Sequence, residues 1–248
     1  MCAEGVRFSI ANQVAWAPGL ATPQQWQAWT QTPFPIAATG EPGVRQMAPL
    51  LRRRAGQLGK MALEVAYACL GEARNIPIVF CSRHGEVVRA IDLLSSLSHG
   101  ELLSPTAFGM AVHNASAALF SIARADQANQ LALAAGAASV EAAVIEACGL
   151  LADGAPQVLL LAADSPLPEP FARFDDEDGQ AHAFAWLLQA GSGQGGDISL
   201  AWRARAAGDT VNDSAMPASL AALRFVLGKA AAYEHVANRQ CWRWSRHA

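Results

Sequence analysis

The side chains that could carry out chemistry in this chain are scattered, and they form no familiar catalytic or metal-binding motif. None of the six histidines lies at metal-ligand spacing from another histidine or a cysteine, so we predict no metal site. Five widely spaced cysteines without a CxxC pair are typical of reduced, buried thiols. These residues are His84, His99, His113, His182, His235 and His247, and Cys2, Cys69, Cys81, Cys148 and Cys241.

Two glycine-containing stretches have the residues of a phosphate-binding loop but not its context. Residues 191–196 fit G-x-G-x-x-G, yet strands are expected on both sides, whereas phosphate binding needs a strand before and a helix after the glycines. Gly228-Lys229 lacks the upstream glycine and the hydroxyl residue of a P-loop. We therefore interpret 191–196 as a hairpin loop and predict no cofactor.

Two further candidates have a plain structural interpretation. His113 adjoins Asn114 just before an expected helix, and a hydrogen-bonded structural histidine is the favoured interpretation. The acidic run 175–178, followed by Gly179, could bind a divalent cation, but such a cluster is more often a solvated loop.

Three adjacent arginines, Arg52, Arg53 and Arg54, stand near the start of an expected helix. Clustered guanidinium groups bind carboxylates and phosphates through paired hydrogen bonds, so an acidic partner such as a carrier protein is one interpretation. An exposed helix start with no partner is the other. Positive charge at a helix N-terminus is unfavourable, and the sequence leaves both open.

Composition excludes several classes of protein. The 248 residues include 52% hydrophobic and 16% charged residues, enough for a large core and an apolar surface that suggests a buried interface. A net charge of -3 argues against nucleic acid as the main partner. Charged residues interrupt every long apolar run, and the first ten residues do not resemble a secretion signal. We therefore expect a cytoplasmic protein without a membrane span.

Hydrophobic periodicity indicates an α/β fold. We expect a first strand over 6–17, a short helix that Thr22 caps and Pro23 opens, and a loop over 30–49. An amphipathic helix follows over about 62–73, with the three arginines and Lys60 in its first turns. Further helices are expected over 86–97 and 115–125, with a Ser104-Pro105 turn between them.

The remaining elements should build the sheet around one interior helix. Residues 76–81, 130–134 and 157–163 are expected to be strands, the first and last buried on both faces. The stretch 137–152 is apolar almost all round, which predicts a helix inside the molecule.

The C-terminal third changes to a period of two. Residues 184–188 and 198–202 are expected to form an antiparallel pair that closes a mixed sheet. A helix over 218–231 and a terminal strand over 241–244 should follow. We expect a single domain over 1–248, with 206–248 a C-terminal helix and strand extension.

Three groups of residues stand out as motifs: Leu51-Arg52-Arg53-Arg54 with Met61-Ala62-Leu63, Ser104-Pro105 with Asn114, and 175–179 before the Phe184 strand. They resemble the N-terminal half of the thiolase-like condensing enzymes, the beta-ketoacyl synthases, from about residue 45 to 190. The short ketosynthase-like family related to chain-length factors of aryl polyene pigment clusters is the most similar. The resemblance implies a thiolase-like half-fold: a mixed five-stranded sheet, a buried central helix and helices on both faces.

The same resemblance implies that the nucleophile is missing. An active ketosynthase has A-C-x-S-G at the turn before the central helix, where the helix dipole lowers the pKa of the cysteine thiol. Aligning back from Gly154 and the 157–163 strand puts Ala137 at the position of that cysteine. A methyl group cannot form the acyl thioester. We also expect the chain to end before the half that supplies two catalytic histidines in the family.

Two rival functions remain open from the sequence. One is an acyl hydrolase or acyltransferase that uses Ser139, Cys148 or His113, although Ser139 lacks an evident base and Cys148 falls within an apolar helix. The other is a self-associating scaffold that binds a ligand.

The resemblance also implies a partner chain. The family dimer pairs the third strand across a two-fold axis, which corresponds here to 130–134, and an uncovered edge strand would invite aggregation. Residues 108–113 would reach toward the partner's acyl tunnel, so Phe108, Met110, His113 and Asn114 are the expected contacts. We therefore predict a noncatalytic subunit that pairs with an active ketosynthase as a chain-length factor does, or with a second copy of itself.

Overall fold

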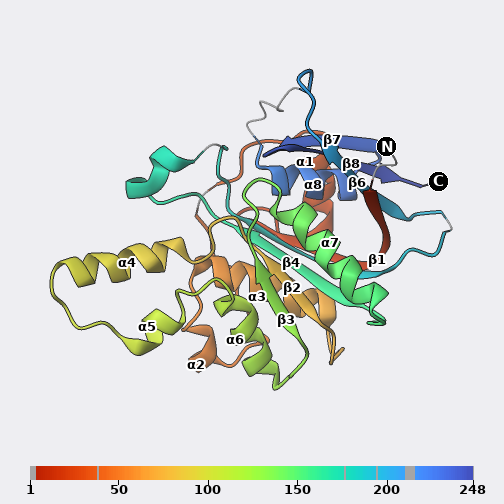
Figure 1. Cartoon of the computed structure of the whole chain (residues 1–248). Helices are drawn as coiled ribbons and strands as arrows, with labels where there is room; N and C mark the ends of the chain where they lie inside the picture. The colour runs from red at the N-terminus through yellow and green to blue at the C-terminus, as the bar shows by residue number, and fades with distance from the viewer. Residues whose placement is uncertain (1–3, 38, 176, 194, 210–215, 248) are drawn as a thin grey trace.

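The computed structural model describes residues 4–37, 39–175, 177–193, 195–209 and 216–247 (Figure 1). These residues form one mixed sheet in the order β3-β2-β4-β5-β1-β6-β8-β7. The strands are β1 (Glu4–Trp16), β2 (Ile78–Cys81), β3 (Gln130–Leu133), β4 (Val158–Asp164), β5 (His182–Ala190), β6 (Ile198–Ala204), β7 (Ala232–Ala237) and β8 (Gln240–Arg246).

Helices cover both faces of this sheet. They are α1 (Pro23–Gln31), α2 (Pro49–Arg52), α3 (Gln57–Leu70), α4 (Val87–Ser98), α5 (Pro105–Gly109), α6 (Ala115–Arg124), α7 (Ser139–Ala152), α8 (Ala218–Leu227) and the 3-10 turn η1 (Glu169–Phe174). No helix among the described residues is long and apolar enough to cross a membrane.

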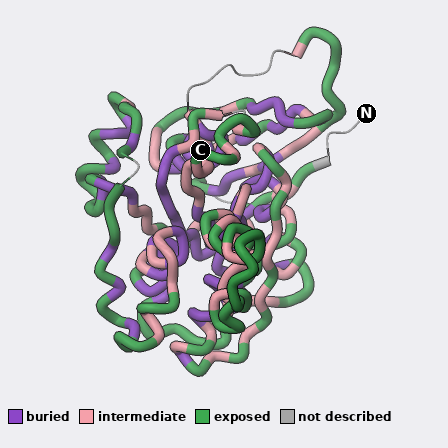
Figure 2. The backbone as a smooth tube through the Cα atoms, turned by 90° about the vertical axis from the view of Figure 1, so that its left-hand side faces the viewer, coloured by how far each residue is buried: buried purple, intermediate pink, exposed green. Residues whose placement is uncertain are grey.

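Alternation along the central strands creates two separate cores. On β4, Leu160 and Ala162 belong to the core beneath α1, α7 and α8, whereas Leu159 and Leu161 belong to the core beneath α3 and α6. Strands buried on both faces must be apolar throughout, as the sequence predicted for this one. Figure 2 shows buried stretches toward the middle of the molecule and exposed segments around them. The predicted α/β fold with helices on both faces is confirmed.

The sheet is larger than predicted, with eight strands in the described residues instead of five. β5 and β6 were expected to pair with each other. Instead β1 lies between them and pairs with both. Residues 232–237, for which the sequence predicted no element, form β7, and β7 pairs with β8. Period-two alternation identifies strands but not their partners, which explains these errors.

Three helix predictions also need correction. Arg52 ends the separate helix α2, and Arg53 and Arg54 lie in the turn before α3, so none of the three is in the first turns of the amphipathic helix. The Ser104-Pro105 turn opens the short helix α5, which Ser104 caps. Finally, α7 buries one side only, and Glu146 on its other side is exposed.

Candidate functional site

The turn that joins β3 to α7 is built from small residues. Gly136 has a positive φ of 59°, which suits glycine, and Ala138 occupies the N-cap position of α7. Ala137, between them, is half-buried and lines a large cleft. The resemblance places the nucleophile at this residue. The side chain of Ala137 is a methyl group, which cannot act as a nucleophile.

Ser139 cannot replace the missing nucleophile in this geometry. Its hydroxyl donates to the carbonyl oxygen of Gly136 at 2.7 Å and accepts from the backbone N–H of Ala135 at 3.0 Å. The side chain is also buried. Ser139 therefore closes the turn before α7, and no described histidine is hydrogen-bonded to it.

Cys148 and His113, the other rival candidates, are also in structural settings. Burial raises the pKa of the Cys148 thiol to about 11, so it is protonated at neutral pH and is a poor nucleophile. Nε2 of His113 lies 3.0 Å from the carbonyl oxygen of Leu133, and its ring packs at a tilt against Phe80. The structural interpretation of His113 fits these contacts.

A buried polar cluster behind the turn was not predicted. Oε1 of Glu141, in the first turn of α7, lies 3.2 Å from Nδ1 of His235 and accepts from Nε1 of Trp244 at 3.2 Å. The second carboxylate oxygen has no partner within the described part of the chain. A glutamate on the buried side of a largely apolar helix was the available signal, because a buried carboxylate requires donors from elsewhere in the fold.

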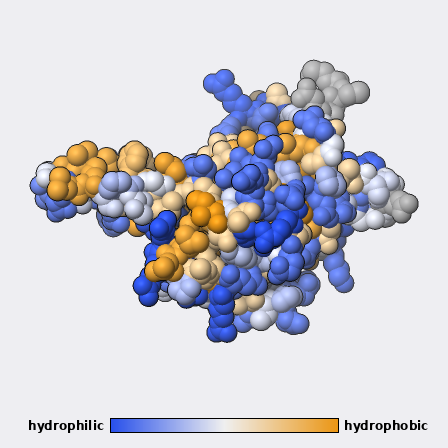
Figure 3. All heavy atoms as spheres, turned by 90° about the horizontal axis from the view of Figure 1, so that it is seen from below, coloured by the Kyte–Doolittle hydropathy of each residue, from blue (hydrophilic) through white to orange (hydrophobic). Residues whose placement is uncertain are grey.

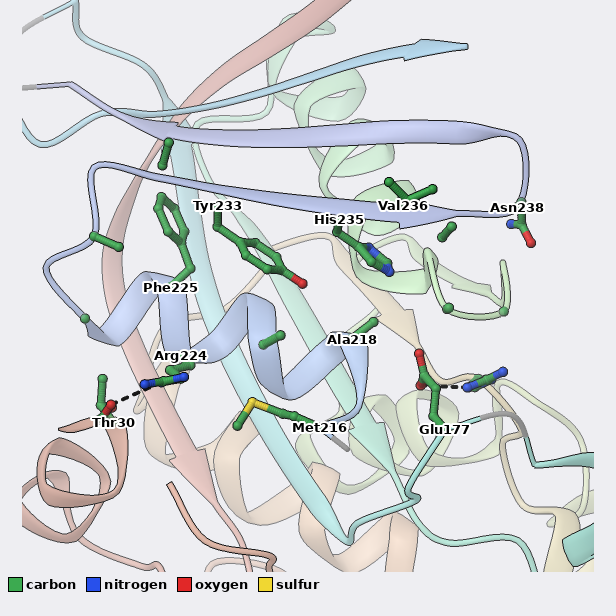
Figure 4. Close-up of a pocket in the computed structure, with 18 of the residues that line it drawn as sticks. Thr30, Glu177, Met216, Ala218, Arg224, Phe225, Tyr233, His235, Val236 and Asn238 are labelled. Carbon is green, nitrogen blue, oxygen red and sulfur yellow. Dashed lines mark hydrogen bonds and ion pairs between the residues drawn. The ribbon is translucent and has the colours of Figure 1, made fainter. Parts of the chain in front are cut away.

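The cleft beside Ala137 lies between α8, β7 and the turn before α7, and has a volume of about 780 Å³ (Figure 4). At one end Arg83 forms an ion pair of 2.6 Å with Glu177, and at the other Nε of Arg224 donates to the carbonyl oxygen of Thr30 at 3.1 Å. Tyr233 and His235 extend from β7 toward the cleft. This site was not predicted, because its walls come from segments far apart in the chain.

A second polar cluster lies at the end of β4. Asp164 is opposite His182 in the register of β4 and β5, and it accepts from Ser82 Oγ at 3.1 Å and from the backbone N–H of Arg83 at 2.7 Å. Burial raises the pKa of Asp164 to about 6 and lowers that of His182 to about 4. Burial therefore shifts both groups toward their neutral forms.

The acidic run after η1 is only partly solvated. Its member Glu177 is half-buried and pairs with Arg83, whereas Asp178 is exposed. Asp176 lies outside the described residues. The prediction of a wholly solvated loop is therefore wrong at Glu177. The described residues contain no group of three acidic, histidine or cysteine side chains able to hold a metal ion.

An arm formed by α4 and α5 projects from the body of the molecule (Figure 1). None of the twelve residues of α4 is buried, although the helix carries several apolar side chains. Figure 3 shows apolar atoms along this projection. The large exposed apolar residues of the arm and its loops are Val88, Leu94, Leu97, Leu102, Leu103 and Phe108. Such a surface is unusual for an isolated protein and typical of an interface.

The structure separates the four predicted tunnel residues. Phe108 is 64% exposed on the arm, whereas Met110 packs against the core beneath α3 and α6. His113 is half-buried by Phe80, and Asn114 is exposed at the start of α6. Phe108 is therefore the most available of the four for another chain, and contact with a partner's tunnel stays a prediction.

β3 is an edge of the sheet and pairs within the described residues with β2 alone. Leu131, on this strand, is 39% exposed. The edge therefore presents both unpaired backbone groups and apolar side chains, as expected of a strand that a second chain covers.

The three arginines have different surroundings. Nη1 of Arg52 donates to the carbonyl oxygens of Gly43 and Val44, at 3.1 and 3.4 Å, so this side chain holds the preceding loop. Arg53 and Arg54 are exposed. Only these two remain available for an acidic partner.

Residues 26–245 match the family described as the beta-ketoacyl synthase, N-terminal domain. The chain belongs to this family. The predicted resemblance is therefore confirmed, and the match extends beyond the range from 45 to 190 that the motifs indicated. Comparison with curated proteins gives no match.

Solved structures of ketosynthases share this fold. A chain in the complex of the ketosynthase ApeO with its chain length factor ApeC from Xenorhabdus doucetiae is 26% identical, with a TM-score of 0.81 over 97% of this chain and 100% of that chain. Ketosynthase twelve of the bacillaene polyketide synthase from Bacillus amyloliquefaciens is 12% identical, with a TM-score of 0.56.

The ishigamide ketosynthase/chain length factor is 14% identical, with a TM-score of 0.53. The chain described here spans only 46% of the length of the bacillaene ketosynthase and 59% of the ishigamide protein. These two similarities show the fold alone.

Proposed function

We propose that this chain is a noncatalytic ketosynthase-like subunit that pairs with an active ketosynthase and shapes its acyl pocket, as a chain length factor does. The observation that carries the proposal is Ala137, which presents a methyl group at the turn where the family's cysteine would stand. Without a thiolate there, the chain cannot form the acyl thioester on which condensation depends.

Two surfaces support the pairing part of the proposal. The β3 edge exposes Leu131, and the α4–α5 arm exposes Leu97 and Phe108. Apolar side chains exposed to water in this way favour association with a second chain. The similar chain in the ApeO–ApeC complex comes from an assembly of a ketosynthase with its chain length factor, which argues for the same kind of assembly here. An acyl carrier protein is a further proposed partner, through Arg53 and Arg54.

The hydrolase and acyltransferase alternatives receive no support from the site. The hydroxyl of Ser139 is used within its own turn, the Cys148 thiol is protonated, and His113 is hydrogen-bonded to a backbone carbonyl. Self-association remains as a distinct outcome of the pairing experiment, because the same apolar edge could join two copies.

The test is coexpression of the tagged chain with a ketosynthase encoded in the same gene cluster. The complex is then purified and its mass is measured. We expect a heterodimer. In addition, Leu131→Arg should weaken pairing, because it puts an unpaired charge into the interface. The matched control is Phe174→Arg, which replaces another exposed apolar residue away from β3. A homodimer that excludes the ketosynthase would contradict the proposal, as would equal pairing by Leu131→Arg and the control.

A further inference from the structure

The α4–α5 arm leaves the body of the molecule at a buried carboxylate. We propose that Glu86 is a positioning residue that sets the direction of this arm, and that pairing with a ketosynthase depends on that direction. The pairing part rests on the function proposed above. Glu86 is the N-cap residue of α4 and is only 8% exposed, whereas no residue of α4 itself is buried.

Packing alone does not fix the arm. Among the helices and strands, α5 makes the main contact with α4, and α5 has no buried residue either. A groove of about 550 Å³ lies between the first two turns of α4 and residues 165–168 of the body. A helix with no buried face, beside an open groove, would change direction freely unless specific contacts held its root.

The Glu86 carboxylate joins three helices at the root of the arm. It accepts from the backbone N–H of Gly59, in the first turn of α3, and its Oε1 accepts from Oγ of the buried Ser116, on α6, at 3.4 Å. Nε of Arg89, one turn along α4, lies 3.4 Å from Oε2. The N-cap residue of α4 thus places its charge at the N-terminus of α3, where a negative charge is favourable.

Two glycines at the start of α3 leave the space that this carboxylate occupies. A Cβ added at Gly56 would lie 2.8 Å from Oε2 of Glu86, and one added at Gly59 would lie 3.1 Å from Oε1. Gly56 has an ordinary φ of -72°, so the backbone would accept alanine there. The methyl group would instead displace the carboxylate.

Arg89 provides a second connection between the arm and the body. Its Nη2 donates to the carbonyl oxygen of Arg54, in the turn before α3, at 2.7 Å. The side chain of Arg89 is only 25% exposed. Without the Glu86 carboxylate this cation would lose its ion-pair partner and turn toward water, and the second connection would be lost with the first.

Distances between spin labels test the direction of the arm in the isolated chain. One label is placed at position 97, an exposed residue of α4, and the other at position 239, on the β7–β8 turn. Both are attached through noncanonical residues, which avoids the native thiols. We expect a narrow distance distribution for the otherwise unchanged chain and a broad one for Glu86→Ala. Labels at 146 and 239, both on the body, should give the same distribution in both proteins.

Further variants separate the position of the carboxylate from general damage. Gly56→Ala keeps Glu86 but displaces its carboxylate, and should also broaden the 97–239 distribution. Glu86→Gln keeps an acceptor oxygen at the same reach and should restore most of the narrow distribution. Two controls should leave it unchanged: Asp92→Ala, which removes an exposed carboxylate from α4, and Gly109→Ala, whose added Cβ would meet nothing within 4 Å.

Pairing is measured next, with the purified ketosynthase and unlabelled chains, by biolayer interferometry. We expect Glu86→Ala and Gly56→Ala each to weaken binding about tenfold, because only molecules whose arm has the competent direction can bind. The loss should lie mainly in the association rate, since the exposed apolar side chains of the arm are unchanged.

Two results would overturn the proposal. One is an equally narrow 97–239 distribution with and without Glu86→Ala or Gly56→Ala, and the other is a broadened distribution with unchanged affinity. If Glu86→Ala does not fold, Gly56→Ala decides alone. A wild-type chain that binds no ketosynthase would contradict the function proposed above, whereas the label distances in the isolated chain would still test the role of Glu86.

Discussion

His235 and Glu141 join the C-terminal hairpin to the helix that follows the Ala137 turn. Nδ1 of His235, on β7, lies 3.2 Å from Oε1 of Glu141, on α7, and both side chains are buried. The same oxygen accepts from Nε1 of Trp244 on β8. The hairpin that extends the sheet is thus attached by polar contacts to the first turn of α7, directly after the Ala137 turn that lines the cleft.

Removal of the Glu141 carboxylate should be strongly destabilising. Glu141→Ala leaves a buried histidine and a buried indole N–H without their acceptor, and we expect a loss of about 3–5 kcal/mol in the free energy of unfolding. The measurement is urea denaturation. Glu146→Ala, at an exposed position of the same helix, is the matched control and should change stability by no more than about 0.5 kcal/mol. Similar losses in both variants would contradict the role of the pair.

Asp164 and His182, opposite each other on β4 and β5, should give opposing pH dependences. Burial raises the pKa of Asp164 from 3.8 to about 6, so its ionisation costs stability as pH rises through that interval. Burial lowers the pKa of His182 from 6.5 to about 4, so its protonation costs stability as pH falls through that interval. The two effects overlap between about pH 4 and 6 and partly cancel.

In the Asp164→Asn variant, the contribution of His182 to the pH dependence of the free energy of unfolding should no longer be partly cancelled. The amide oxygen can still accept from Ser82 and from the backbone of Arg83, so the local structure should persist. The free energy of unfolding of this variant should rise between pH 4 and 6.5 by on the order of 3 kcal/mol, at about 1.4 kcal/mol per pKa unit. His182→Gln should show the opposite slope. Chemical denaturation at several pH values tests both, and a variant curve parallel to the wild-type curve would refute this explanation.

The isolated chain should show no condensing activity, because Ala137 has no thiolate. The assay combines it with a carrier-bound acyl chain and a malonyl donor and follows both product and acyl-enzyme mass. Ala137→Cys alone should also give no turnover, since His113, His182 and His235 are hydrogen-bonded to other groups. Condensation above background by the wild-type chain would rule out the noncatalytic role.

Phe108→Ala should shift the product chain-length distribution of the coexpressed ketosynthase without lowering the melting temperature. Phe108 is exposed in the isolated chain, so its removal creates no cavity in the core. A vacated tunnel site is worth about 0.8 kcal/mol per methylene, which predicts a gradual shift. Phe34→Ala removes another exposed ring, on the loop that follows α1, and should leave the products unchanged. Normal assembly with an unaltered distribution would remove Phe108 from the tunnel.

Met110→Trp provides a second measurement of the same surface. Met110 is partly buried against the core beneath α3 and α6, so this substitution tests whether the residue serves the core or the tunnel. A changed product distribution with normal folding assigns it to the tunnel. Loss of folding would make it an ordinary core residue.

Arg53→Glu together with Arg54→Glu should weaken binding of an acidic carrier protein or of the partner chain. The effect should be larger at low salt, where screening of exposed charges is least. Arg52 is left unchanged because it holds the loop at Gly43 and Val44. Arg239→Glu is a remote exposed control, and binding affinity is measured at two salt concentrations. Equal affinities for all three proteins would make Arg53 and Arg54 ordinary surface charges.

The sequence by itself determined many of the local elements and carries the prediction that Ala137 stands at the nucleophile position. The continuous apolar run of β4 predicted a strand buried on both faces, and Thr22 with Pro23 predicted the start of α1, where a capping box forms. The placement of Ala137 before α7 also needed only the spacing to β4. These features depend on neighbours in the chain, whose preferences a sequence displays directly.

Only the tertiary structure decided which distant segments meet. It placed β1 between β5 and β6, brought Glu141 to His235 across 94 positions, and enclosed a cleft between α8 and β7. An alternating strand can pair with any strand of matching pattern, and a buried glutamate can bond any donor that reaches it. The free energy that selects among these partners comes from packing the whole sheet and its helices at once, and no local stretch of sequence contains it.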